Sequence, residues 1–263
     1  MLKGILSDLG SVLVAYSGGT DSTLLLKVAH DELGEKAVAA TAVSASMPAE
    51  EAEEAARLAR GIGAEHLLLE SEELDNPDFR ANPPDRCYYC KYLCFQKLLE
   101  LARDRGLQYV VDGANLGDLG DHRPGMRASR ELGVRSPLME ASLDKADIRE
   151  LSRRLGLSTW DKPAEACLAS RIPYGTPITR DKLQQIEDAE RFLHSLGVSQ
   201  VRVRVHGGVA RIEVAPENLP LILEHRSAIA RELHRLGFSY VTADLEGYRT
   251  GSMNEVLGPD SHG

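Results

Sequence analysis

The distribution of hydrophobic residues predicts short strands alternating with amphipathic helices over the first two thirds of the chain. Nearly continuous apolar runs of strand length occur at residues 12–16, 37–43, 66–70, 109–112 and 136–139. Segments with apolar residues at helical spacing lie between or after them, at residues 22–33, 48–61, 91–105 and 144–156. Buried strands that alternate with helices are typical of a parallel sheet covered on both faces. We therefore expect an α/β fold with a five-stranded parallel sheet.

The pattern changes after Pro177. It predicts a helix, a hairpin that turns at His206-Gly207-Gly208, a second helix and a last strand, at residues 181–196, 201–205, 210–214, 219–236 and 240–244. This order suggests a small α+β domain with an antiparallel sheet. We expect a first domain over residues 1–175, a second over 176–255 and a disordered tail over 256–263.

Composition and charge narrow the class of protein. The chain has 263 residues, of which 43% are hydrophobic, a formal net charge of -9 and an isoelectric point near 5.4. An acidic balance argues against the broad anion-binding surface that tRNA binding usually requires. No apolar run of about 18 residues and no basic-then-apolar N-terminus is present, so we expect a cytosolic protein without a membrane span or signal peptide. In such a protein the four cysteines favour thiol, metal or catalytic roles over disulfides.

A glycine-rich turn follows the first predicted strand. It consists of Ser17, Gly18, Gly19, Thr20, Asp21 and Ser22, and a predicted helix follows it. Glycines let backbone N–H groups approach an anion, and a helix N-terminus favours negative charge, so the turn predicts a nucleotide-phosphate site. Its S-G-G-x-D-S pattern resembles the pyrophosphate loop of enzymes that split ATP between the α and β phosphates. The resemblance implies that Ser and Gly residues hold pyrophosphate and that Asp21 helps to place Mg²⁺.

Two further groups are expected near this loop. Asp112 and Asn115 follow the fourth predicted strand, on the same edge of the sheet, where short acidic and amide side chains can hold Mg²⁺ or the nucleotide. Arg123 and Arg127 continue that loop and offer two cations for a carboxylate or phosphate.

The cysteines form the spacing C-x-x-C-x-x-x-C at Cys87, Cys90 and Cys94. On a helix these offsets place the three sulfurs on one face, which suggests zinc or iron–sulfur ligation. Cys94 shares its face with leucines and is equally explained as a core residue. Cys167 is a candidate remote ligand.

Two other stretches carry candidate chemistry. Residues 162–174 bring Cys167, Ser170 and Arg171 into a proline-interrupted loop, and cations near a thiol lower its pKa. Arg202 and Arg204 alternate on a predicted strand, so both lie on one face and suit an anion. A solvated sheet face paired with Glu190 or Glu213 explains them equally well.

Taken together, the motifs resemble one family over residues 13–254. They are AYSGGTDS, DRCYYCK, DGANLGDxxxxRPGxRA, KPAEACLASRIPYG, VRVRVHG and LEGYRTGSMN. This set is similar to the ATP-dependent sulfur transferases that make the nickel-pincer nucleotide cofactor of lactate racemase, the LarE family. The resemblance implies that a carboxylate of pyridinium-3,5-biscarboxylic acid mononucleotide is adenylylated by ATP and that sulfur then displaces AMP to leave a thiocarboxylate.

The resemblance also implies residue roles. Cys167 matches the cysteine that, in the sacrificial variant, gives up its own sulfur. Other members use a C-x-x-C together with this cysteine to hold a 4Fe-4S cluster, and Cys87 with Cys90 favours that route here. Arg202 and Arg204 match the arginines that bind the substrate phosphate, Ser170 and Arg171 lie near the reacting thiol, and Glu190 and Glu213 are weaker candidates for an acidic metal site. The implied partners are a small nucleotide substrate, a sulfide or other sulfur donor and further copies of the chain.

Three other functions share parts of the pattern. An amide-forming synthetase of the NAD or GMP type would leave the cysteines without a role. A tRNA thiolation enzyme joins this loop to cysteines but conflicts with the acidic charge. An ATP-binding module with structural zinc predicts bound zinc and no AMP formation.

Overall fold

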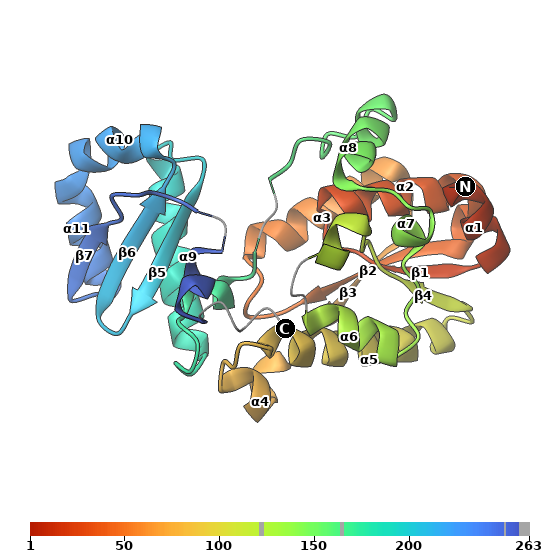
Figure 1. The fold of residues 1–263 in the computed structure, drawn as a ribbon, viewed down its shortest axis with the longest axis horizontal. Helices are drawn as coiled ribbons and strands as arrows, with labels where there is room; N and C mark the ends of the chain where they lie inside the picture. Colours follow the sequence, from red (N-terminus) through yellow and green to blue (C-terminus); the bar gives the residue numbers. More distant parts are fainter. Residues whose placement is uncertain (121–123, 164–165, 250, 258–263) are drawn as a thin grey trace. The chain divides into compact units, whose positions relative to one another are not determined.

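The computed structural model describes residues 1–120, 124–163, 166–249 and 251–257. The chain forms two compact units (Figure 1): Met1–Phe79 with Pro84–Glu165, and Arg80–Pro83 with Ala166–Gly263. Residues 166–175, which the sequence pattern assigned to the first domain, group with the second unit. Most of the predicted disordered tail lies outside the described residues. Within the described part, no helix is both long and apolar enough to cross a membrane.

A parallel four-stranded sheet forms the centre of the first unit (Figure 1). Its strands lie in the order β3-β2-β1-β4 and span β1 Val12–Ala15, β2 Ala37–Val43, β3 His66–Glu70 and β4 Tyr109–Val111. Val12 of β1 pairs with Ala37 on one side and with Tyr109 on the other. The carboxyl end of β1 therefore lies between those of β2 and β4, which is where such sheets bind ligands.

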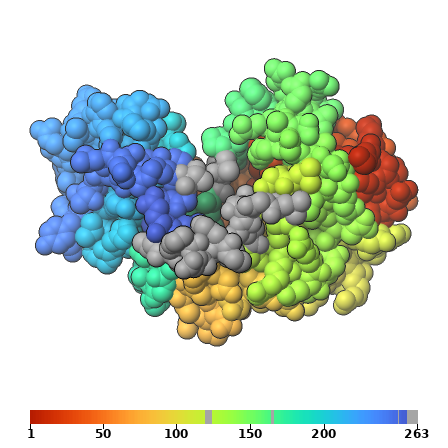
Figure 2. Space-filling model, in the orientation of Figure 1, coloured from red at the N-terminus to blue at the C-terminus, as the bar shows by residue number. Residues whose placement is uncertain are grey.

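Helices cover both faces of this sheet. Val12 and Val14 face a core that α1 Leu2–Leu9, α2 Thr20–Leu33, α3 Ala49–Ile62, α7 Pro137–Glu140 and α8 Lys145–Arg154 complete. Leu13 and Val38 face the opposite core with α5 Arg86–Asp104 and α6 Pro124–Glu131. Because alternate side chains point to opposite faces of a strand, the continuous apolar run of β1 fills both cores. The segment that contains α8 lies at the surface of the unit (Figure 2).

The predicted fifth strand, residues 136–139, is wrong. Arg135 makes a single parallel bridge to Val111, with a hydrogen bond of 2.9 Å from the Asp112 N–H to the Arg135 carbonyl. Pro137 then starts the helical turn α7. Proline lacks an N–H for a sheet ladder and favours the first turn of a helix, so pairing stops after one residue.

Three helices occur where none was predicted. The helix α1 buries Leu2, Leu6 and Leu9 at helical spacing. Residues 71–86, which lie between a predicted strand and a predicted helix, contain a short 3-10 turn, Glu73–Asp75, and the one-turn helix α4, Pro77–Arg80. The helix α6 begins at Pro124, within the stretch expected to continue the loop after β4.

The second unit is built on a three-stranded sheet in the order β5-β6-β7. Its elements are α9 Arg180–Ser195, β5 Val201–His206, β6 Val209–Val214, α10 Leu219–Glu224, α11 Arg226–Arg235 and β7 Tyr240–Ala243. The β5–β6 hairpin is antiparallel as expected, but β7 pairs parallel to β6, so the sheet is mixed. The helical connection between β6 and β7 accounts for this, because a crossover returns the chain in the same direction. The predicted single helix over residues 219–236 is divided at His225.

Candidate functional site

The predicted phosphate loop lies at the carboxyl end of β1 and leads directly into α2. Gly18 has φ of 72°, and a Cβ atom built on it would lie 3.1 Å from the Cα atom of Ala55 in α3. Positive φ and this close approach both require glycine. The Ser17 and Ser22 hydroxyls are 3.1 Å apart, and the Gly19 N–H donates to the Ser17 hydroxyl at 3.3 Å. The loop is thus pre-formed, with the N-terminus of a 14-residue helix behind it.

Thr20 has a structural role in this loop. Its side chain is buried, and its hydroxyl donates to the Thr159 carbonyl at 2.8 Å and lies 3.4 Å from the Lys162 carbonyl. The Lys162 ammonium group forms an ion pair of 2.7 Å with Glu54 of α3. Hydrogen bonds therefore join the start of α2 to residues 159–162, which follow α8.

Lys145 is a residue of the loop that the sequence did not indicate. Its ammonium group donates to the two carboxylate oxygens of Asp21 at 2.7 and 2.8 Å. The Asp144 N-cap and Asp147 form a capping box at the start of α8 and hold Lys145 as the first helical residue. The helix was predicted from the apolar pattern of residues 144–156, but nothing in that pattern could have predicted the contact with Asp21, 124 positions away in the chain. The loop therefore has a lysine, supplied from α8 rather than from within the motif.

Asp112 and Asn115 lie beside the loop, at the carboxyl end of β4. A Cβ atom on Gly113 would lie 3.1 Å from the backbone nitrogen of Ser22, so the two turns are in contact. The Asp112 Oδ1 atom accepts from the Ser136 hydroxyl at 2.7 Å, whereas its buried Oδ2 atom has no hydrogen-bond partner. Asn115 uses its side-chain oxygen within its own turn, accepting from the Gly117 N–H at 2.9 Å. Asp112 thus has an acceptor left for a ligand, and Asn115 shapes the turn.

The two arginines expected after this turn differ. Arg123 lies outside the described residues. Arg127 is on α6, where its guanidinium stacks 3.7 Å from the centre of the Tyr88 ring and lies 3.5 Å from the Glu131 carboxylate. Arg127 therefore contacts the C-x-x-C segment of α5 and the adjacent turn of its own helix.

The cysteines of α5 fall into two groups. Cys87 is exposed and Cys90 partly exposed, neither is in a disulfide, and both lie near the start of the helix. Cys94 packs against the core that contains Phe95 and Leu98, and burial raises the pKa of its thiol to about 11. Among the described residues, no cluster of three or more His, Cys, Asp or Glu side chains comes together to hold a metal. Cys87 and Cys90 belong to the first unit and Cys167 to the second.

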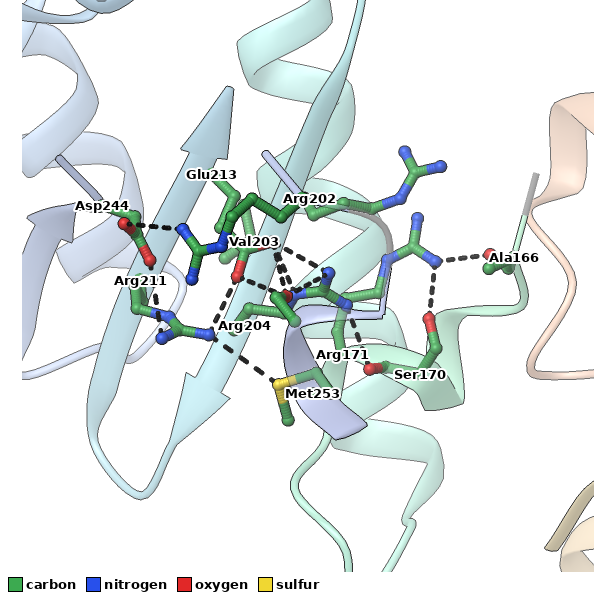
Figure 3. A network of polar contacts seen from close by, with 12 residues as sticks. Ala166, Ser170, Arg171, Arg202, Val203, Arg204, Arg211, Glu213, Asp244 and Met253 are labelled. Carbon is green, nitrogen blue, oxygen red and sulfur yellow. Dashed lines mark hydrogen bonds and ion pairs between the residues drawn. The ribbon is translucent and has the colours of Figure 1, made fainter. Parts of the chain in front are cut away.

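Cys167 lies at the start of a short turn in the second unit, Leu168–Arg171, and is exposed. The Ser170 N–H donates to the Cys167 carbonyl at 2.9 Å and closes the turn. Arg171 is buried and points back along the turn, where it donates to the Cys167 carbonyl and the Ser170 hydroxyl, both at 3.0 Å, and to the Ala166 carbonyl (Figure 3). Arg171 therefore holds the backbone that carries the thiol.

Arg202 and Arg204 lie on one face of β5, as expected, but in different environments (Figure 3). The Arg204 guanidinium donates to Glu213 at 2.8 and 3.0 Å and to the Ser170 carbonyl at 3.1 Å, and it is almost fully buried. Arg202 hydrogen-bonds the Val201 carbonyl and lies 5.6 Å from the Tyr248 ring. The pKa of Arg202 is lowered, mainly because its side chain is buried and also because the positive charge of Arg171 is near. Both effects disfavour the charged guanidinium, and a bound anion would offset them.

Glu190 and Glu213, the two acidic residues considered for a metal site, both form ion pairs with arginines. Glu190 accepts two hydrogen bonds from Arg171 and one from the Val203 N–H. Glu213 accepts from Arg204, Arg211 and the Ser252 hydroxyl. A metal ion would have to displace these arginines.

The pre-formed S-G-G-x-D-S loop at the end of β1, within a parallel sheet, defines a protein of the pyrophosphate-loop class of nucleotide-binding proteins. No protein-family model matches the chain. It is 41% identical over 97% of its length to pyridinium-3,5-bisthiocarboxylic acid mononucleotide synthase of Lactiplantibacillus plantarum, covering 93% of that protein. It is also 48% identical over 97% of its length to an uncharacterized protein of Synechocystis and 30% identical over 91% to one of Methanocaldococcus jannaschii, covering 96% and 91% of those chains. The chain therefore belongs to the family of pyridinium-3,5-bisthiocarboxylic acid mononucleotide synthase, an enzyme family.

Proposed function

We propose that the protein is an ATP-dependent sulfur transferase. Its substrate would be pyridinium-3,5-biscarboxylic acid mononucleotide and its product the corresponding thiocarboxylate, a step in nickel-pincer nucleotide synthesis. The observation that carries the proposal is the near full-length relation to a synthase of the bisthiocarboxylic acid mononucleotide. The phosphate loop and the exposed Cys167 supply the two chemical functions that this reaction needs.

The first half-reaction activates the carboxylate. A carboxylate oxygen of the substrate attacks the α-phosphorus of ATP, the bond to the bridging oxygen of the β-phosphate breaks, and pyrophosphate leaves with the electron pair. The loop N–H groups, Ser17 and the N-terminus of α2 would bind the departing pyrophosphate. Lys145, held by Asp21, would neutralise the charge that develops on it. Mg²⁺ brought by ATP would share Asp21 with Lys145.

The second half-reaction replaces oxygen by sulfur. A sulfur nucleophile near Cys167 attacks the acyl carbon of the adenylate, the bond from that carbon to the AMP oxygen breaks, and AMP leaves with the electron pair. A carboxylate needs this activation because its oxygen is a poor leaving group until it is part of a phosphate ester. The exposed thiol at the start of its turn is accessible to an acyl adenylate.

The donor set fits a 4Fe-4S cluster in kind. Cys87 and Cys90 are three residues apart on one helix and at least partly exposed, and Cys167 is a third, exposed cysteine; none of the three is in a disulfide. Three thiolates would leave one iron able to carry a sulfide, which would make the sulfur transfer repeatable. The buried Cys94, with its raised pKa, is a poor fourth ligand.

The second unit would bind the substrate phosphate. We assign the direct contact to Arg202, because its guanidinium contacts a backbone carbonyl and an aromatic ring, whereas the Arg204 guanidinium is paired with the Glu213 carboxylate. Arg204 would then hold the site in place through its hydrogen bonds to Glu213 and to the Ser170 carbonyl. Assembly into a homo-oligomer through this unit stays a prediction.

The test combines two measurements on protein purified without oxygen. The first is pyrophosphate release, which we expect to depend on the pyridinium mononucleotide; release that depends on tRNA instead would favour a tRNA thiolation enzyme. The second is iron and acid-labile sulfide in the wild type and in Cys87→Ala, Cys167→Ala and the control Cys94→Ala. About four irons per chain, lost in the first two variants and kept in the control, would support the cluster. If the protein contains no iron and Cys87→Ala is still active, the sulfur comes from the Cys167 side chain itself.

A further inference from the structure

A buried ion pair links the turn that carries Cys167 to α9 and β5, in addition to the hydrogen bond of 3.1 Å from Arg204 to the Ser170 carbonyl. Arg171, at the end of the turn, donates from Nε and Nη2 to the two carboxylate oxygens of Glu190 at 2.9 and 2.8 Å. Glu190 belongs to α9, and its Oε1 atom also accepts from the Val203 N–H at 2.8 Å. The side chains of Arg171 and Glu190 are 3% and 8% exposed.

This arrangement places one carboxylate between two parts of the proposed site. Val203 is the residue between Arg202 and Arg204, so Glu190 fixes the backbone of β5 where the substrate phosphate would bind. Through Arg171, the same carboxylate fixes the carbonyls of Ala166 and Cys167. The three elements involved, the turn, α9 and β5, all belong to the second unit.

The energetics favour a positioning role over a contribution to stability. A buried ion pair loses hydration that its attraction barely replaces, so exchanging it for uncharged residues is often neutral or stabilising. Positioning is different, because a displacement of about 1 Å at a reacting group can cost 100-fold in rate. The bidentate geometry defines the orientation of the guanidinium, and with it the position of the turn.

We propose that Glu190 is a positioning residue of the sulfur-transfer step, which holds the Cys167 turn and the strand of Arg202 in fixed register through Arg171. The metal-binding role that the sequence suggested for Glu190 stays a prediction. The inference rests on the proposed function for its activity assay, but the contacts that carry it do not depend on that function.

The first test measures the two half-reactions separately in Glu190→Gln. Glutamine keeps an acceptor for the Val203 N–H but loses the charge that holds Arg171. We expect pyrophosphate release to stay within about threefold of wild type and thiocarboxylate formation to fall about 100-fold, the scale set by misplacement of a reacting group. The matched control is Glu187→Gln, one turn earlier on α9, whose carboxylate pairs at 3.4 Å with the half-exposed Arg191. The control should match wild type in both half-reactions.

A double variant separates positioning from folding. Glu190→Gln alone removes the carboxylate that pairs with the buried Arg171 guanidinium and will destabilise the unit. Arg171→Met combined with Glu190→Gln removes both charges and keeps the acceptor for Val203. We expect the thermal midpoint to return toward wild type while sulfur transfer stays low. Recovery of transfer together with stability would show a merely structural role and would overturn the proposal.

Hydrogen exchange gives a readout that is independent of activity. Amide exchange over residues 166–172 should accelerate at least tenfold in Glu190→Gln and in the double variant, and should be unchanged in Glu187→Gln. Unchanged exchange and wild-type transfer in Glu190→Gln would refute the inference. If the wild type itself makes no thiocarboxylate, the proposed function fails, and the exchange result alone decides whether Glu190 holds the turn.

Discussion

Replacing Lys145 by methionine tests the chemistry of the phosphate loop most directly. Methionine keeps much of the length and apolar stem of lysine but removes the ammonium group that contacts both oxygens of Asp21. If Lys145 acts on the phosphates of ATP, the loss should appear in catalysis. If it serves only as the partner of Asp21, the loss should appear in stability.

The structure separates the two magnitudes. The side chains of Lys145 and Asp21 are 41% and 27% exposed, and a pair exposed to this degree contributes at most about 1 kcal/mol to stability. We expect a fall of about 3 °C or less in the thermal midpoint. A preorganised cation beside developing charge is worth about 100- to 1000-fold in rate, and we expect a loss of that size in substrate-dependent pyrophosphate release.

The assay follows pyrophosphate release under saturating ATP, with thermal unfolding recorded on the same preparations. Lys27→Met is the matched control, because Lys27 and Asp31 form an ion pair of the same length, 2.7 Å, further along α2. The control should lose similar stability and no activity. Lys145→Met with a rate within threefold of wild type would refute the role of Lys145 in pyrophosphate departure.

Three further predictions follow from single residues. Gly18→Ala should lower pyrophosphate release at least tenfold, because φ of 72° and a contact of 3.1 Å with Ala55 exclude a side chain; Gly34→Ala, which also has positive φ but no such neighbour, should retain activity, and equal effects would contradict the argument. Arg202→Gln should raise KM for the mononucleotide about tenfold or more and leave KM for ATP unchanged; an effect on ATP alone would remove Arg202 from the substrate site. Cys94 should react with iodoacetamide at pH 8 about 100-fold more slowly than an ordinary cysteine, because its pKa is raised from 9.0 to about 11. Since the folded-state pKa is raised, the stability contributed by this thiol is present below pH 9 and is lost as the pH rises through about 11, and Cys94→Ala should flatten that loss; equal labelling of Cys94 and Cys87 would show that the thiol is not buried.

The sequence predicted all four strands of the parallel sheet, two of them in both bounds. The runs at residues 37–43 and 66–70 match β2 and β3 in both bounds. The run at 136–139 failed because apolar content alone does not distinguish a strand from a buried helical turn, and Pro137 decided the outcome. The direction of β7 depended on the path of a connection, which local periodicity does not contain.

The site was predictable where its residues are neighbours in the chain. The loop from Ser17 to Ser22 adopts the strand, turn and helix that its spacing indicates. The contacts of Lys145 with Asp21 and of Arg171 with Glu190 were not predicted, because they join residues 124 and 19 positions apart in the chain. A charged residue at a helix start or on a helix face gives no local sign of its partner.

Residues 80–83 belong to the second unit although the chain on both sides of them belongs to the first, and this affects how the protein folds during synthesis. The Asn82 side chain, fully buried, reaches the carbonyls of Ile172, Pro173 and Thr176 at 2.8 to 3.2 Å, and the Asn82 carbonyl accepts from the Gly175 N–H at 2.9 Å. These partners leave the ribosome about 90 residues after Asn82, several seconds later at ordinary translation rates. Until then these hydrogen bonds of Asn82 cannot form. A fragment that begins at residue 166 would lack this segment, so a recombinant C-terminal piece should fold only when residues 80–83 are supplied in trans or by circular permutation.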